Sequence, residues 1–273
     1  MNRYFFIAIF FLVSFFSSAQ TYEELVSKSL DYLDEKEYAA AELTLKEAMR
    51  KEPANEGNIL LLANLGTIQR HLGKSEEALI SYSSALSKYP NNIFVLQNRA
   101  ALYCELDSLN AAMKDYNIIL SMDENNIEAL YRRGLIFMSE KNLLAAESDF
   151  EQILDINPEN ILALSSLAFS LKSRGEWIEA EDKYTDLIFK YKNQPEFYVN
   201  RAECYLQLDK KGRAKSDLDK AQQLGYNDPL LYILKGQLDI HQFDKFSAKR
   251  NFEKALEMGA DKEIIKQYLL LCK

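Results

Sequence analysis

The chain has 273 residues, of which 48% are hydrophobic and 27% charged, a composition typical of folded proteins rather than of disordered ones. Its formal charge of −8 argues against nucleic-acid binding, which needs a basic surface, and against attraction to an anionic membrane. Nine Gly and five Pro leave few residues for the turns of a β-rich architecture.

Residues 1–19 are predicted to be a secretory signal peptide. Arg3 supplies a positive charge, residues 4–16 form an apolar stretch of 13 residues, and Ser17 and Ala19 are the small residues of a cleavage site before Gln20. The alternative is an uncleaved membrane anchor, but a membrane span needs about 20 apolar residues, so the stretch is short for one. We therefore expect an exported protein, periplasmic or extracellular, without stable membrane insertion after cleavage.

The rest of the chain repeats with a period of 34 residues. The stretch EEALISYSSALSKYPNN at 76–92 returns 68 residues later, twice 34, as LAAESDFEQILDINPEN at 144–160. Units of this length begin at 22, 59, 93, 127, 161, 195 and 229, with one three-residue insertion at 56–58. A fixed period of this size is typical of solenoid proteins.

Within each unit, counted from its first residue as position 1, two apolar stripes recur at helical spacing. Positions 4, 8 and 11 form one stripe, positions 20, 24, 27 and 28 form the other, and positions 13–16 between them are polar or Gly. Position 8 is always small, and position 20 is always Ala: Ala41, Ala78, Ala112, Ala146, Ala180, Ala214 and Ala248. Each unit is therefore predicted to be two antiparallel helices that approach closely where position 8 faces position 20.

This pattern resembles the tetratricopeptide repeat family, whose unit is a 34-residue helix–turn–helix with the same small and large positions. The resemblance covers residues 22–262 and implies an all-α, right-handed superhelical solenoid of seven repeats, at 22–55, 59–92, 93–126, 127–160, 161–194, 195–228 and 229–262. Residues 263–273 are predicted to be a capping helix over the last repeat. Gln69 and Asp239 depart from the family's aromatic residue at position 11.

The sequence offers no set of residues suited to catalysis or to metal binding. His71 and His241, the only histidines, lie five repeats apart, and no zinc-ligand, Cys-x-x-Cys or phosphate-loop motif occurs. Cys104, Cys204 and Cys272 are spread over distant repeats, so we interpret them as buried or half-buried free thiols. We therefore predict no enzyme activity, no cofactor and no metal.

Three arginines occupy position 7, where the family prefers Leu: Arg99, Arg133 and Arg201. The favoured interpretation is that each aliphatic stem packs between helix layers while the guanidinium reaches solvent. The alternative is that each guanidinium has a carboxylate partner.

The first helices of stacked hairpins line an inner wall, and positions 2, 5, 9 and 12 lie on one face of such a helix. The resemblance implies that this concave wall binds the ligand. The predicted groove residues are Phe94, Gln97, Tyr131, Leu135, Met138, Leu162, Phe169 and Lys172. The alternative is that some of these side chains pack on the neighbouring repeat. The Lys/Asn clamp of chaperone-binding family members is absent, because Leu60, Ala63 and Glu128 stand at its positions.

The sequence thus predicts a non-enzymatic protein–protein interaction scaffold that holds a peptide segment or a partner protein in its concave groove. The alternative is a structural subunit of a cell-envelope assembly or secretion complex, which would use the convex or edge surfaces. Co-purification of a discrete peptide ligand would favour the first function, and a stable multi-subunit complex would favour the second.

Overall fold

Helices make up the regular structure of residues 20–272, the part of the chain that the computed structural model describes. No strand occurs among these residues, so the predicted all-α helical-repeat class is confirmed. The predicted signal peptide at 1–19 lies outside the described residues. Over residues 20–272, none of the helices has the length and apolar character needed to cross a membrane.

The chain divides after Asp115 into two compact units. The first unit contains α1 (Tyr22–Asp34), α2 (Tyr38–Lys51), α3 (Asn58–His71), α4 (Ser75–Lys88) and α5 (Ile93–Glu105). The division falls within α6 (Leu109–Met122). The second unit continues with α7 (Ile127–Ser139), α8 (Leu143–Ile156), α9 (Ile161–Ser173), α10 (Trp177–Lys190), α11 (Pro195–Gln207), α12 (Lys211–Gln223), α13 (Pro229–His241), α14 (Lys245–Glu257) and α15 (Lys262–Leu271).

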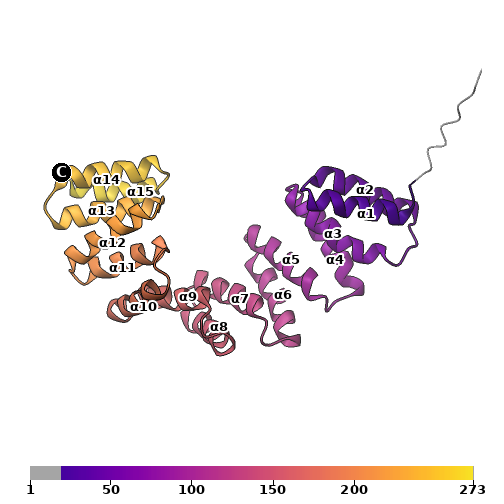
Figure 1. The fold of residues 1–273 in the computed structure, drawn as a ribbon, viewed down its shortest axis with the longest axis horizontal. Coiled ribbons are helices and arrows are strands. Elements are labelled where there is room, and N and C mark those ends of the chain that lie inside the picture. The colour runs from indigo at the N-terminus through magenta and orange to yellow at the C-terminus, as the bar shows by residue number, and fades with distance from the viewer. Residues whose placement is uncertain (1–19, 273) are drawn as a thin grey trace, which may run out of the picture. The chain divides into compact units, whose positions relative to one another are not determined.

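Consecutive helices pack as hairpins, which Figure 1 shows along the chain. In the second unit the pairs are α7 with α8, α9 with α10, α11 with α12, and α13 with α14. The first helices of neighbouring pairs also contact one another, α7 with α9, α9 with α11, and α11 with α13. These contacts make a continuous row of first helices in the second unit, and most of the predicted groove residues lie on this row.

The turn inside each hairpin places position 15 in the left-handed backbone region. Its φ angle is positive in all seven predicted units: Lys36, Gly73, Asp107, Lys141, Gly175, Asp209 and Phe243. Gly adopts this conformation without strain, Asp tolerates it, and a bulky residue such as Phe243 does not. The repeated geometry therefore outweighs the local preference of the residue that occupies this position.

Asparagine side chains start three of the first helices. Asn92, Asn126 and Asn160, 34 residues apart, each accept a hydrogen bond from a backbone N–H in the first turn, at 3.2, 3.1 and 3.0 Å. These bonds satisfy N–H groups that have no partner inside the helix. Pro195 and Pro229 open α11 and α13, where the missing N–H of proline costs nothing.

Close packing inside each hairpin depends on position 8. The Ala at position 20 is fully buried in all seven units, as the period predicts. Position 8, however, faces mainly the ring at position 24: a Cβ on Gly134 would lie 2.6 Å from Phe150, and one on Gly66 would lie 2.7 Å from Tyr82. In the first hairpin, where position 24 is Leu45, position 8 does contact position 20, since Ser29 donates a 2.9 Å hydrogen bond to the Ala41 carbonyl. Small residues are needed because the ring occupies the space that a side chain would fill.

Helix α15 packs on α14 and α13 at the C-terminal end of the second unit (Figure 1). Ile265 is fully buried there, and the Tyr268 ring stacks on Phe252 with 5.0 Å between the ring centroids. This helix thereby covers apolar surface of the last hairpin that would otherwise face water.

Candidate functional site

The predicted groove residues fall in both units. Phe94 on α5 is exposed and Gln97, one turn later on the same helix, is half-buried, and both belong to the first unit. The other six lie on α7 and α9 in the second unit.

In the second unit, four of the predicted residues line one hollow between first helices. Leu135 and Met138 come from α7, and Leu162 and Phe169 come from α9. The hollow has a volume of about 510 Å³ and extends to Phe197 on α11. We call this hollow, with Leu135, Met138, Leu162, Phe169 and Phe197, the groove pocket. Its volume lies in the range of about 300–1,000 Å³ that is common for ligand sites.

Two apolar residues of the groove pocket, both on α9, are accessible, whereas Phe197 on α11 is buried. Leu162 is 50% exposed and Phe169 is 42% exposed. Polar groups edge the same hollow on α11 and the turn before it: Gln194, Glu196 and Asn200. An apolar floor with a few polar groups at its rim is suited to an apolar side chain flanked by a hydrogen-bonding backbone.

Tyr131 takes part in the core more than in the groove pocket. Its ring lies 6.0 Å from the Phe150 ring, centroid to centroid, and it packs against the buried cluster around Leu130. Tyr131 is not among the residues that line the pocket. Tyr131 therefore packs in the core of its own hairpin, which is neither the predicted groove position nor the alternative of packing on the neighbouring repeat.

Lys172 is buried instead of presenting a free charge in the groove. Its Nζ donates to Asn200 Oδ1 at 2.7 Å and to Glu203 Oε2 at 2.6 Å, both on α11. The same ammonium lies 4.7 Å from the centre of the Phe169 ring. Lys172 thus ties α9 to α11 and holds Phe169 in place, so its charge is already neutralised by Glu203.

The three arginines at position 7 are paired with carboxylates, so the favoured interpretation was wrong and the alternative is correct. Arg133 donates from Nε and Nη2 to the two oxygens of Asp149, at 2.9 and 2.7 Å. Its remaining Nη1 donates to Asn117 Oδ1 at 2.8 Å. The equivalent pairs are Arg99 with Asp115 and Arg201 with Asp217. The hydrogen bonds that Arg99 donates to Asp115 raise the pKa of Arg99, while burial acts in the opposite direction.

Cys204 is buried and Cys104 and Cys272 are partly buried, as predicted, and none of the three forms a disulfide. Burial raises the pKa of Cys204 to about 12, which keeps the thiol protonated and unreactive at neutral pH. Within residues 20–272, no group of three or more His, Cys, Asp and Glu side chains is arranged to hold a metal ion.

Comparison with known proteins identifies the family. A crystal structure of a tetratricopeptide repeat protein from Parabacteroides merdae is 43% identical, covers 93% of this chain and 99% of that chain, and superimposes with a TM-score of 0.78. The chain belongs to the tetratricopeptide repeat family. The family model described as Tetratricopeptide repeat matches residues 127–160 and 195–224 of this tetratricopeptide repeat protein, the regions of α7–α8 and α11–α12.

Two more distant matches add the fold alone. The structure of pilF from Pseudomonas aeruginosa is 16% identical, covers 78% of this chain and 96% of that chain, and has a TM-score of 0.63. The serine/threonine-protein phosphatase T of Aspergillus oryzae is 43% identical over 49 residues, which are 18% of this chain. The chain spans only 10% of the length of that phosphatase. Tetratricopeptide repeat proteins are in general non-enzymatic scaffolds, and this chain is a protein-interaction scaffold of that family.

The residues lining the groove pocket that the sequence did not single out lie on α9, α10 and α11 and in the turn before α11. Phe197 and Asn200 stand at positions 3 and 6, which are next to the face of positions 2, 5, 9 and 12. The hollow lies between neighbouring first helices, so each helix contributes the edge of its face that turns toward its neighbour. These residues could have been found by including the positions next to 2, 5, 9 and 12 in the predicted binding face.

Proposed function

We propose that this tetratricopeptide repeat protein binds an extended peptide segment of a partner by inserting an apolar side chain into the groove pocket. One observation carries the proposal: apolar side chains from α7, α9 and α11 line a single hollow of about 510 Å³, and two of them, Leu162 and Phe169, are exposed. Exposed apolar surface of this kind usually marks an interaction site, because leaving it in water is unfavourable.

The charge around the groove pocket favours an apolar anchor over an acidic one. The ammonium of Lys172, which lies 4.7 Å from the centre of the Phe169 ring, is bonded to Glu203, and Glu196 lies on the rim. An acidic peptide would meet a carboxylate without an available cation, which is unfavourable. The proposed ligand is therefore a segment with a large apolar side chain, and its backbone would bond to Gln194 and Asn200.

We further propose that the protein acts outside the cytoplasm and without enzyme activity. The support for export is the signal-like order of charge, apolar stretch and small residues at 1–19. Sequencing the N-terminus of the protein secreted by its own cell tests this. A mature chain that starts at Gln20 supports export with cleavage, and a cytoplasmic chain that retains Met1 contradicts it.

The binding proposal is tested with a displayed library of random peptides selected on the wild-type protein. The enriched peptides are then measured against Leu162→Asp and against Leu144→Asp, a matched change on α8 at a residue that is 76% exposed. We expect Leu162→Asp to weaken binding by about tenfold or more, because a charge is placed in an apolar anchor site, while Leu144→Asp has no effect. Equal binding to both variants would show that the groove pocket is not the site.

A second function, that of a structural subunit in an envelope assembly, is favoured by a separate observation. Several large apolar side chains on second helices are strongly exposed: Leu144, Ile178, Phe189 and Phe246. Scattered exposed apolar residues are common on monomers, so this observation is weaker than a formed pocket. Loss of a co-purifying complex in Leu144→Asp but not in Leu162→Asp would favour this second function.

A further inference from the structure

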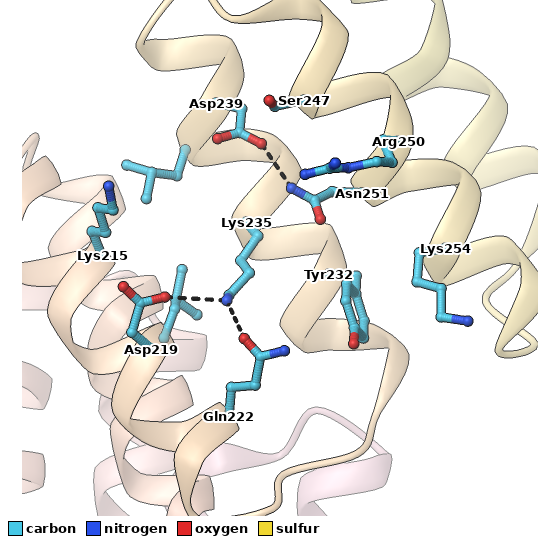
Figure 2. A pocket seen from close by; sticks show the side chains of 12 residues that line it. Lys215, Asp219, Gln222, Tyr232, Lys235, Asp239, Ser247, Arg250, Asn251 and Lys254 are labelled. Carbon is cyan, nitrogen blue, oxygen red and sulfur yellow. Dashed lines mark hydrogen bonds and ion pairs between the residues drawn. The ribbon is translucent and has the colours of Figure 1, made fainter.

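A second hollow lies at the C-terminal end of the second unit, between α12, α13 and α14 (Figure 2). Its volume is about 480 Å³, and it shares no residue with the groove pocket. We call it the cationic pocket, because four basic side chains line it against two acidic ones: Lys215, Lys235, Arg250 and Lys254 against Asp219 and Asp239. This excess is opposite in sign to the net charge of −8 of the whole chain.

At the cationic pocket the arginine–aspartate pair that three other hairpins contain is missing. In α11–α12 the corresponding space is closed by Arg201 and Asp217, which form two hydrogen bonds of 2.7 and 2.8 Å. In α13–α14 the equivalent residues are Lys235 and Asn251, at positions 7 and 23. Lys235 turns back to Asp219 and Gln222 on α12, and Asn251 donates instead to Asp239 at 2.7 Å. Figure 2 shows the opening that remains between these two sets of bonds.

A second substitution makes the same place more positive. Position 21 is a glutamate in three other units, and each glutamate pairs with a base of the next hairpin: Glu42 with Lys74, Glu147 with Arg174, and Glu181 with Lys210. At this position α12 carries Lys215, which lines the cationic pocket. Replacement of Asp by Asn251 and of Glu by Lys215 shifts the local charge toward positive at both sites.

Two of the four cations have no paired carboxylate within residues 20–272. Lys235 is paired with Asp219, and Lys254 is paired with Glu257 at 3.1 Å, while the Asp239 carboxylate accepts a hydrogen bond from Asn251. Across residues 20–272, neither Lys215 nor Arg250 has a hydrogen-bonded or ion-paired carboxylate. The positive charges of both act to lower the pKa of Asp239. In Figure 2 the guanidinium of Arg250 lies beside Asn251, across the opening from Lys215.

We propose that the cationic pocket binds a small organic anion that carries carboxylate or phosphate groups on an apolar body. Lys215 and Arg250 supply the charge, from opposite sides of the opening. Tyr232, Leu218 and Leu238 supply an apolar wall, which a bare inorganic ion would leave unused. A volume of about 480 Å³ accommodates a small molecule.

The test uses the purified protein and isothermal titration calorimetry at constant ionic strength, because screening weakens exposed charges. The probes are isophthalate for a dicarboxylate, phenyl phosphate for a phosphate ester, and isophthalamide as a neutral analogue of the first. We expect saturable one-to-one binding of isophthalate or phenyl phosphate with a Kd below about 1 mM, and no binding of isophthalamide. The stronger of the two anions identifies the preferred head group.

Two lysines on α12 give a matched pair of variants. Lys215→Glu places a carboxylate in the cationic pocket and should weaken anion binding by at least about tenfold, because like charges repel strongly. Lys220→Glu makes the same change on the same helix, at an exposed residue outside the pocket, and should leave the affinity within about twofold of wild type. Arg250→Gln, which removes charge without reversing it, should also weaken binding. Thermal melts of each variant confirm that it is folded.

Three results would overturn the proposal. The first is no saturable binding of either anion, and the second is an equal loss of affinity in Lys215→Glu and Lys220→Glu. The third is that a hexaglutamate peptide binds and the two small anions do not, since that would make the pocket a contact for an acidic protein segment. Leu162→Asp should bind the anions like wild type, so the outcome is independent of the peptide groove.

Discussion

The hairpins α11–α12 and α13–α14 follow each other in the chain and have the same helix lengths, yet they solve the same packing problem differently. In α11–α12 the guanidinium of Arg201 bonds to Asp217 and Thr185 and lies 5.5 Å from the ring of Tyr205. In α13–α14 the residues at the three corresponding positions are Lys235, Asn251 and Asp239, and the cationic pocket remains open.

The comparison shows that a repeat keeps its fold when the residues at positions 7, 11 and 23 change together. In every unit with Arg at position 7, position 23 is Asp and position 11 is aromatic. In the units with Gln or Asp at position 11, position 23 is a small polar residue that forms a hydrogen bond with position 11. The pairs of the second kind are Ser81 with Gln69, at 2.7 Å, and Asn251 with Asp239. The departures at position 11 are therefore satisfied locally, which agrees with the finding that no buried side-chain nitrogen or oxygen in residues 20–272 lacks a hydrogen bond.

The largest expected effect comes from breaking the closed hairpin. Asp217→Ala leaves the half-buried Arg201 without its carboxylate and should destabilise the protein by about 3–5 kcal/mol, measured by urea unfolding. Asp219→Ala, two residues away on α12, removes a carboxylate that is 51% exposed, against 8% for Asp217, and should cost less than about 1 kcal/mol. Similar losses in the two variants would contradict the difference drawn between the hairpins.

A smaller effect is expected at the turns of the same two hairpins. Position 15 has a φ of 56° at Asp209 and 62° at Phe243. Asp tolerates this backbone region and Phe is strained in it, so Phe243→Gly should stabilise the protein by about 1 kcal/mol. Phe246→Gly, the same change inside α14, should instead destabilise it by about 0.5 kcal/mol, because Gly is a poor helix former. The prediction fails if thermal melts shift in the same direction for both.

The structural features that recur with the 34-residue period are predicted well from the sequence. Ala at position 20 and a small residue at position 8 were identified from spacing alone, and their burial follows because every unit packs the same way. Four of the eight predicted groove residues line the groove pocket, since the face of a helix is set by its 3.6-residue turn. Contacts between repeats were harder to predict: Lys172 bonds to Asn200 and Glu203 of the next hairpin, and helical periodicity does not reveal these contacts.

The arginine pairs could have been predicted from the sequence. Asp occurs at position 23 only in the three units that have Arg at position 7: Asp115, Asp149 and Asp217. The two positions lie 16 residues apart, on different helices of one hairpin, so a helical-wheel argument for a single helix does not connect them. Joint variation of positions 7, 11 and 23 is the signal that does, and it also reveals where the pattern changes to form the cationic pocket.

The smallest expected effect is electrostatic and concerns Asp239, the acidic replacement for Tyr205 in the open hairpin. Burial raises the pKa of Asp239 above the usual 3.8, and the nearby Asp244 adds to this, while Asn251 acts against it. The folded protein therefore binds this proton more tightly than the unfolded chain does. The contribution of Asp239 to stability rises as pH falls through its folded pKa and is unfavourable at neutral pH.

Asp239→Asn should accordingly raise the Tm at pH 7 by about 1–2 °C, and the difference from wild type should shrink as the pH is lowered toward 4. Asp219→Asn removes the same charge from the exposed side of the cationic pocket, where the carboxylate is paired with Lys235 at 3.2 Å, and should not raise the Tm. Asp239→Asn should also strengthen binding of isophthalate or phenyl phosphate, because it removes one of the two carboxylates that oppose an anion there. A Tm difference that stays constant from pH 4 to pH 8 would mean that the burial of Asp239 does not destabilise the open hairpin.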